Sequence, residues 1–113
     1  MFGLDKYFTL PTSTMKSDPA WFGFLLTIKG DLFTRAELVK FLESKQIATR
    51  NLFGGNLTKQ PAFMGVGRIA DILPKSDIVM GKTFWIGVHP GITEEMMDYV
   101  VDMFVEFINE KTN

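Results

Sequence analysis

The residues best suited to chemistry lie together in one segment, 49–63 (TRNLFGGNLTKQPAF). Arg50 offers a planar fork of donors that suits a carboxylate or a phosphate. Gly54 and Gly55 let the backbone turn tightly or approach another group closely, and Asn56 adds a side-chain amide. A connection of this length without regular structure is uncommon in a compact domain and is usually functional. We therefore predict that this segment forms one half of a binding site.

Two of these residues also have purely structural explanations, which the sequence leaves open. Arg50 can form an ion pair with one of the many acidic residues at the end of a strand. Asn56 can occupy a turn, because asparagine tolerates left-handed backbone geometry.

No other motif in the chain builds a complete active site. His89 is the single histidine, and one histidine without further ligands does not make a metal site, so we expect a local role at a strand end. The run GVGRIA at 65–70 matches G-x-G-x-x-A, but the preceding strand that a dinucleotide site requires is missing. Glu94 and Glu95 are explained by the dipole of the helix that they begin. We assign no catalytic residue and no metal ligand.

Composition narrows the class of protein. The 113 residues suffice for one domain, 1–113, with a single core. Hydrophobic residues make up 46%, and the net charge of −1 gives no general attraction to nucleic acid or membranes. The chain has no cysteine, no apolar run of about 18 residues and no signal peptide at its start. We therefore expect a cytoplasmic domain without disulfides.

The pattern of apolar residues predicts an α+β fold. We expect a small, mostly antiparallel sheet of three to four strands, with helices packed mainly on one face. Thr34 and Glu37 form a capping box, which predicts a helix that runs to about Lys45. In the strand 21–28 we expect Phe22 on the same face as Leu26. The other expected elements are a short helix at 4–10, strands at 47–52 and 83–88, one or two short helices within 64–82, and a final helix capped by Thr93.

The final helix has an unusually narrow polar face. Its acidic residues recur every four positions and leave the rest of its surface apolar: Asp98, Asp102, Glu106 and Glu110. We expect one side to pack on the sheet of this domain and the other to contact a second domain or subunit. A deeply buried core helix is the alternative. If the surface is exposed, the isolated chain should self-associate through it.

Four segments resemble one known family: residues 17–24 (SDPAWFGF), 47–50 (IATR), 52–63 (LFGGNLTKQPAF) and 83–88 (TFWIGV). They look like the C-terminal small domain of the CDP-6-deoxy-4-keto-glucose 3-dehydrases. These enzymes of lipopolysaccharide biosynthesis are fold type I members of the pyridoxal-phosphate-dependent nucleotide-sugar aminotransferases. The resemblance extends from about Leu4 to Ile108.

The resemblance implies an activity that this chain does not carry alone. Family enzymes use pyridoxamine phosphate to remove the 3-hydroxyl of a CDP-linked 4-keto-6-deoxy sugar on the way to O-antigen, and an iron–sulfur centre assists the linked reductase step. Cofactor and cluster residues belong to a large domain outside this chain. The expected partners are that large domain, a second subunit in a homodimer and the nucleotide sugar. The resemblance implies substrate-side roles for Arg50, Asn56, Gly54 and Gly55.

Two alternatives remain open. The same small domain occurs with transamination instead of dehydration, and the distinction lies in a lysine or a histidine at the cofactor position of the large domain. The other alternative is a free-standing binding or dimerisation module without catalysis.

Overall fold

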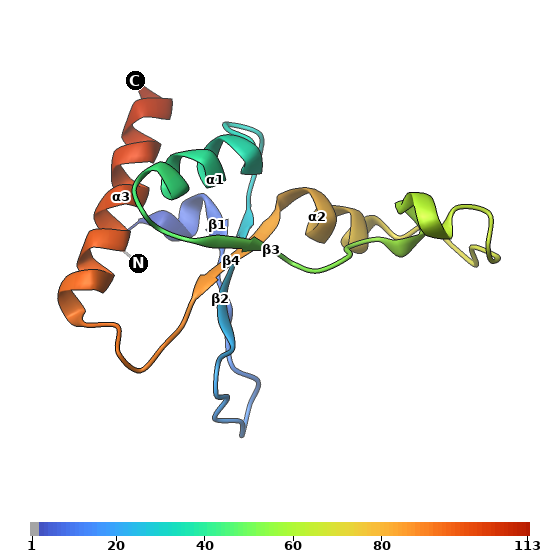
Figure 1. The fold of residues 1–113 in the computed structure, drawn as a ribbon, viewed down its shortest axis with the longest axis horizontal. Helices are drawn as coiled ribbons and strands as arrows, with labels where there is room; N and C mark the ends of the chain where they lie inside the picture. The colour runs from blue at the N-terminus through green and yellow to red at the C-terminus, as the bar shows by residue number, and fades with distance from the viewer. Residues whose placement is uncertain (1–2) are drawn as a thin grey trace.

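A four-stranded antiparallel sheet forms the centre of the computed structural model, which describes residues 3–113 (Figure 1). The strands lie in the order β1-β2-β4-β3. Their bounds are β1 Phe8–Thr9, β2 Gly23–Ile28, β3 Thr49–Asn51 and β4 Thr83–Gly87. The helices are α1 Arg35–Ser44, α2 Pro74–Lys82 and α3 Glu94–Thr112, with short 3₁₀ turns η1 Leu4–Lys6, η2 Leu57–Lys59 and η3 Pro61–Phe63.

Helices α1 and α3 cover one face of this sheet and enclose the core with it. Alternate residues of β2 and β4 point to that face, so Leu26 and Phe84 are fully buried. They pack with buried residues of both helices, among them Leu38, Leu42 and Phe104. The predicted α+β fold with an antiparallel sheet is therefore confirmed.

Both predicted helix starts are present. The Thr34 side chain accepts a hydrogen bond from the Glu37 amide, and the Glu37 carboxylate accepts one from the Thr34 amide at 2.8 Å. The Thr93 hydroxyl accepts from the amide of Met96 at the start of α3. These caps satisfy amides that have no partner within a helix, and they fix where α1 and α3 begin.

The expected helix at 4–10 is wrong in its second half. A single 3₁₀ turn at Leu4–Lys6 is followed by strand β1, whose Phe8 pairs with Ile28 of β2. Phe8 is buried and makes an edge-to-face contact with Phe104, at 5.5 Å between ring centroids. The long-range burial of this ring outweighs the weak local preference for a helix.

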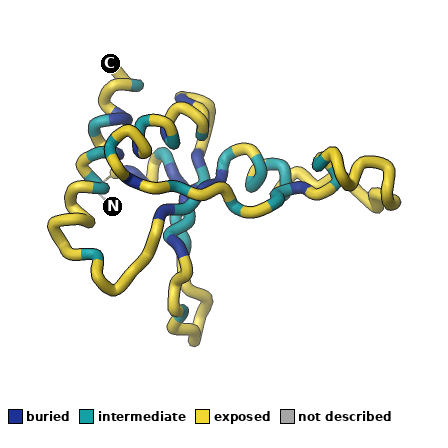
Figure 2. The backbone as a smooth tube through the Cα atoms, in the orientation of Figure 1, coloured by how far each residue is buried: buried dark blue, intermediate teal, exposed yellow. Residues whose placement is uncertain are grey.

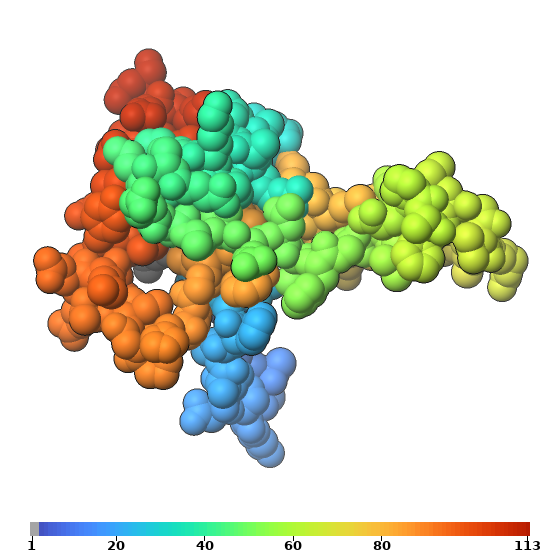
Figure 3. Space-filling model, viewed as in Figure 1, coloured from blue at the N-terminus to red at the C-terminus, as the bar shows by residue number. Residues whose placement is uncertain are grey.

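The segment between β3 and β4, residues 52–82, projects from the body as an arm (Figures 1 and 3). It carries η2, η3 and α2, and every residue of its outer part, 61–75, is exposed (Figure 2). The radius of gyration is 16.0 Å, against about 13 Å for a compact domain of this length. The arm therefore has no core of its own beyond its root.

Helix α3 divides into a buried and an exposed half. Phe104, Phe107 and Ile108 lie in the core, as predicted for one side of this helix. Toward its start, Met96 and Met97 are about half exposed. This half of the helix therefore presents apolar side chains to solvent in the described part of the chain. None of the described helices combines the length and the apolar character that crossing a membrane requires.

Candidate functional site

The root of the arm turns sharply at Gly55. This glycine has a φ of +61°, and a Cβ atom here would lie 2.6 Å from the Cβ of Met80 in α2. Only glycine tolerates both the left-handed backbone and this close approach. Gly55 therefore allows the backbone after β3 to pass directly against α2.

Asn56 fastens the same root to α2. Its side chain is buried, with 3% of the residue exposed. Its amide donates to Asp77 at 2.8 Å, and its carbonyl oxygen accepts from the amide and hydroxyl of Thr58. Lys59 forms an ion pair with Asp77 at 2.9 Å. The hydrogen bond from Lys59, and then that from Asn56, hold the pKa of Asp77 below its usual value.

Arg50 lies on the edge strand β3, directly opposite Trp85 of β4. It is exposed, and no carboxylate of residues 3–113 lies within ion-pair distance of it. It borders an open hollow of about 470 Å³ together with Glu43, Ile47 and Thr49. An unpaired guanidinium beside such a hollow is free to bind an anion.

Gly54 and Gly55 border a different hollow, of about 150 Å³, beside Arg35 and Met80. The side chain of Gln60 donates to the carbonyl of Gly54 at 2.8 Å and closes this turn. The four predicted site residues therefore do not share one pocket. Arg50 and the glycines face separate hollows, and Asn56 is enclosed by the arm.

Four aromatic side chains gather on the sheet face that α1 and α3 leave free. Trp21, Phe22, Phe53 and Trp85 line one apolar hollow of about 220 Å³, and we call them the aromatic face. The rings of Phe22 and Trp85 are 5.1 Å apart between centroids. Phe22 was expected beside Leu26 and is instead 76% exposed, because β2 begins only at Gly23.

Sequence reasoning missed the aromatic face as a unit. If Leu26 faces the core, the alternation in 21–28 puts Trp21 and Leu25 on the opposite face, which is a usable signal. Trp85, however, joins them only through the pairing of β2 with β4, and Phe53 only through the turn after β3. Strands β2 and β4 are separated along the chain by α1, β3 and the arm, so local periodicity does not reveal that the rings meet.

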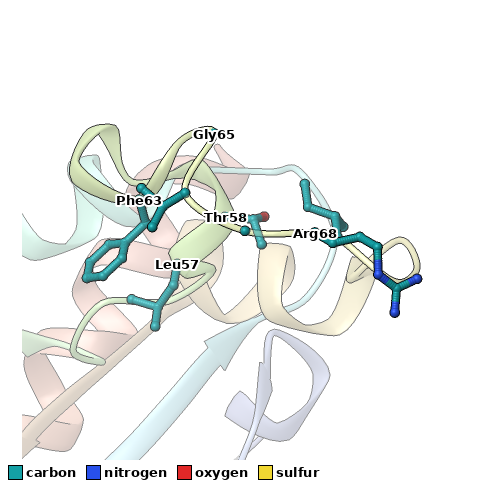
Figure 4. Close-up of a pocket in the computed structure, with 8 residues that line it drawn as sticks. Leu57, Thr58, Phe63, Gly65 and Arg68 are labelled. Carbon is teal, nitrogen blue, oxygen red and sulfur yellow. The ribbon is translucent and has the colours of Figure 1, made fainter.

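The tip of the arm carries a further apolar hollow of about 240 Å³. Figure 4 shows Leu57 and Phe63 on one side of it and Arg68 on the other, with the guanidinium directed outward. The GVGRIA run lies here, after η3 rather than after a strand, so it lacks the setting of a dinucleotide site. Among the described residues no cluster of three potential metal ligands is found.

His89 has the local role that the sequence predicted. Its Nδ1 atom accepts a hydrogen bond from the amide of Gly91 at 2.9 Å. The imidazole therefore stabilises the turn between β4 and α3.

Comparison with known proteins gives two strong relatives by sequence. The chain is 60% identical over 101 residues to dTDP-4-dehydro-2,6-dideoxy-D-glucose 3-dehydratase of Saccharopolyspora spinosa. The aligned region covers 88% of this chain and 22% of that protein. It is 50% identical over 104 residues to the lipopolysaccharide biosynthesis protein RfbH of Salmonella typhimurium. Here the aligned region covers 90% of this chain and 24% of that protein. The chain thus spans about a quarter of the length of these relatives.

A solved structure agrees on the fold. GDP-4-keto-6-deoxymannose-3-dehydratase (ColD) with bound GDP-perosamine superimposes with a TM-score of 0.75 at 24% identity, over 88% of this chain and 28% of that one. At this identity the likeness concerns the fold alone. Residues 2–105, nearly the whole chain, match one family. The chain belongs to the DegT/DnrJ/EryC1/StrS aminotransferase family.

Proposed function

We propose that this chain is the C-terminal small domain of a pyridoxal-phosphate-dependent nucleotide-sugar 3-dehydratase, where it forms the substrate-side wall of the cleft. The observation that carries the proposal is the identity of 60% to a 3-dehydratase across 88% of the chain. The finer substrate that we propose is CDP-4-keto-6-deoxyglucose, in the synthesis of lipopolysaccharide sugars. The incomplete site and the exposed apolar surfaces support a domain that works against a larger partner.

The cofactor belongs to the large domain in this proposal. When bound, pyridoxal or pyridoxamine phosphate supplies an electron sink for bond cleavage next to the sugar carbonyl. The hollows described above are not lined by any lysine or histidine that would occupy the cofactor position. This lining supports a cofactor site in the large domain, and the cysteine-free sequence is consistent with iron–sulfur ligands there.

The residues of this chain act by binding and by excluding water. Arg50 presents a free guanidinium to an anionic part of the substrate, such as the diphosphate. Gly54 and Gly55 form the turn that borders the substrate in this proposal, and Gly55 sets its shape by letting the backbone pack against Met80. Asn56 holds this segment against α2 through Asp77, so its contribution to substrate binding is to fix the geometry of the turn.

A chimaera tests the proposal directly. We would replace the C-terminal quarter of the 60%-identical Saccharopolyspora relative with this chain and follow loss of the 3-hydroxyl from the nucleotide sugar by mass spectrometry. We expect dehydration in the chimaera and none with this chain alone, even with pyridoxal phosphate and keto-sugar nucleotide present. A folded chimaera that binds the cofactor but only transaminates, or turnover by the isolated chain, would contradict the proposal.

A further inference from the structure

The aromatic face has features that packing within this domain does not explain. Helices α1 and α3 cover the opposite side of the sheet, so its rings add nothing to the core. Phe22 and Phe53 are 76% and 80% exposed. Leaving two such rings in water forgoes the usual gain from burying them. Their exposure indicates that another molecule or another part of a larger protein covers this face.

Two backbone features hold these rings in place. Trp85 lies across Gly23, where a Cβ atom would come within 2.4 Å of the Trp85 ring. Its indole therefore lies flat over the strand, with Phe22 against it. Phe53 has a φ of +45°, a left-handed conformation that is strained for a residue with a side chain. Such outliers cluster at ligand sites, where the fold positions a side chain at a cost in stability.

A positive charge lies opposite Trp85 in the sheet, although Arg50 lines the neighbouring hollow beside Glu43 and not the hollow of the rings. Arg50 and Trp85 are direct partners in the β3–β4 ladder, so their side chains leave the same face of the sheet with Cβ atoms about 5 Å apart. Arg50 has no acidic partner within residues 3–113. A flat aromatic surface beside a free guanidinium matches a ligand that joins a planar ring to a phosphate group.

We infer that the aromatic face binds the base of a nucleotide and that Arg50 binds its diphosphate. This deepens the proposed function, on which it rests, by assigning the nucleotide half of the nucleotide sugar to this domain. The size of the hollow agrees: about 220 Å³ is below the roughly 300–1,000 Å³ of a complete small-molecule site. It therefore accommodates one ring system and leaves the sugar outside.

The chain offers an intrinsic probe for this site. It contains two tryptophans, and both of them line the hollow. A base that stacks here should quench the tryptophan fluorescence of the 113-residue chain in a saturable way. We would titrate CDP, dTDP and GDP, with inorganic pyrophosphate as the ligand that lacks a base. We expect quenching by all three nucleotides at millimolar concentration and a weaker, non-quenching interaction with pyrophosphate.

Variants separate the two contacts, with affinities measured by calorimetry. Trp85→Leu removes the ring against which Phe22 packs and so disorders the stacking surface. It should weaken CDP binding by about 10-fold or more, since stacking on one aromatic ring contributes roughly that much. Arg50→Gln should weaken CDP markedly and leave cytidine unchanged. Arg68→Gln, a substitution of another exposed arginine on the arm, is the matched control and should bind like the parent. Circular dichroism of each variant verifies that the sheet is intact.

Three outcomes measured on the isolated chain would overturn the inference. They are the absence of nucleotide binding to the folded chain, equal affinity for pyrophosphate and CDP, or unchanged affinity in folded Trp85→Leu. The active chimaera provides a second readout, in which Trp85→Leu should raise KM for the nucleotide sugar and change kcat little. An active chimaera with an unchanged KM would mean that the large domain or a second subunit covers the aromatic face. In that case the nucleotide inference fails while the proposed function stands.

Discussion

A single methyl group at Gly23 tests the packing of the aromatic face. In Gly23→Ala, the new Cβ atom would lie 2.4 Å from Cε3 and 2.9 Å from Cδ2 of Trp85. Both are ring atoms of an indole that also contacts Phe22. The clash therefore cannot be relieved by a small movement at the end of a flexible side chain. The indole must tilt away from the strand and lose part of its contact with the sheet.

Two opposing effects set the size of the change. A glycine whose φ is negative normally becomes more stable on substitution by alanine, by about 0.4–1 kcal/mol, because the unfolded chain loses freedom. Overpacking against a rigid ring costs about 1–3 kcal/mol. The overlap is severe, so the cost wins and we expect a net loss of roughly 1–2 kcal/mol. For a domain near this size that lowers Tm by about 4–10 °C.

Gly87 provides the matched control. It is the direct cross-strand partner of Gly23, but a Cβ atom there meets nothing within 4 Å. Gly87→Ala should therefore be neutral or slightly stabilising. Thermal unfolding followed by circular dichroism and tryptophan fluorescence measures both variants. If Gly23→Ala is as stable as Gly87→Ala and its fluorescence spectrum is unchanged, Trp85 does not lie over Gly23 and the described aromatic face is incorrect.

Four further predictions concern the arm, the caps, the core and the exposed helix. Asn56→Ala should cost about 1–3 kcal/mol locally, because it leaves buried groups unsatisfied; hydrogen exchange should accelerate at the root of the arm and stay slow in the core. Hydrogen bonds from Lys111, and then from the backbone and side chain of the N-cap threonine, lower the pKa of Glu37 from 4.5 to about 2. The stabilisation is therefore complete above pH 4.5 and is lost as the pH falls toward 2, so Glu37→Gln should flatten the dependence of the urea midpoint on pH in that range. Phe104→Ala removes a fully buried ring and should cost about 3–5 kcal/mol, measured by urea unfolding, whereas unchanged stability would mean that the ring is not in the core. If the isolated chain self-associates through α3, Met96→Glu should shift it toward monomer in sedimentation, and a parent chain that is already monomeric at high concentration would refute that association.

The features that sequence predicted are those that neighbouring residues determine. The capping box of Thr34 and Glu37 lies within one helical turn. The alternation of apolar residues within β2, and likewise within β4, identifies the buried face of each strand without knowledge of its neighbours. The expected helix at residues 4–10 failed because a two-residue strand such as β1 has no periodicity to detect. Its conformation depends on Phe8 reaching Phe104 across the domain.

The contacts around the candidate site residues were predicted only in part, for the same reason. Arg50 was identified from its residue type and its place beside a glycine turn. The partner of Asn56 is Asp77, which lies 21 residues away along the chain, so the sequence did not predict that this amide is enclosed at the root of the arm. The aromatic face depends on strand order, and no local pattern in the sequence encodes that order.

The strand order also has a consequence for how the chain folds. Strand β4 lies between β2 and β3, although it is the last of the four to be synthesised. A nascent chain that ends before Thr83 therefore contains β1, β2 and β3 but lacks the strand that joins β2 to β3, so β2 has one open edge and β3 has no partner at all. Such open edges are prone to intermolecular pairing. Interruption of translation within the arm should therefore yield an aggregation-prone intermediate, because the sheet can be completed only after β4 has left the ribosome.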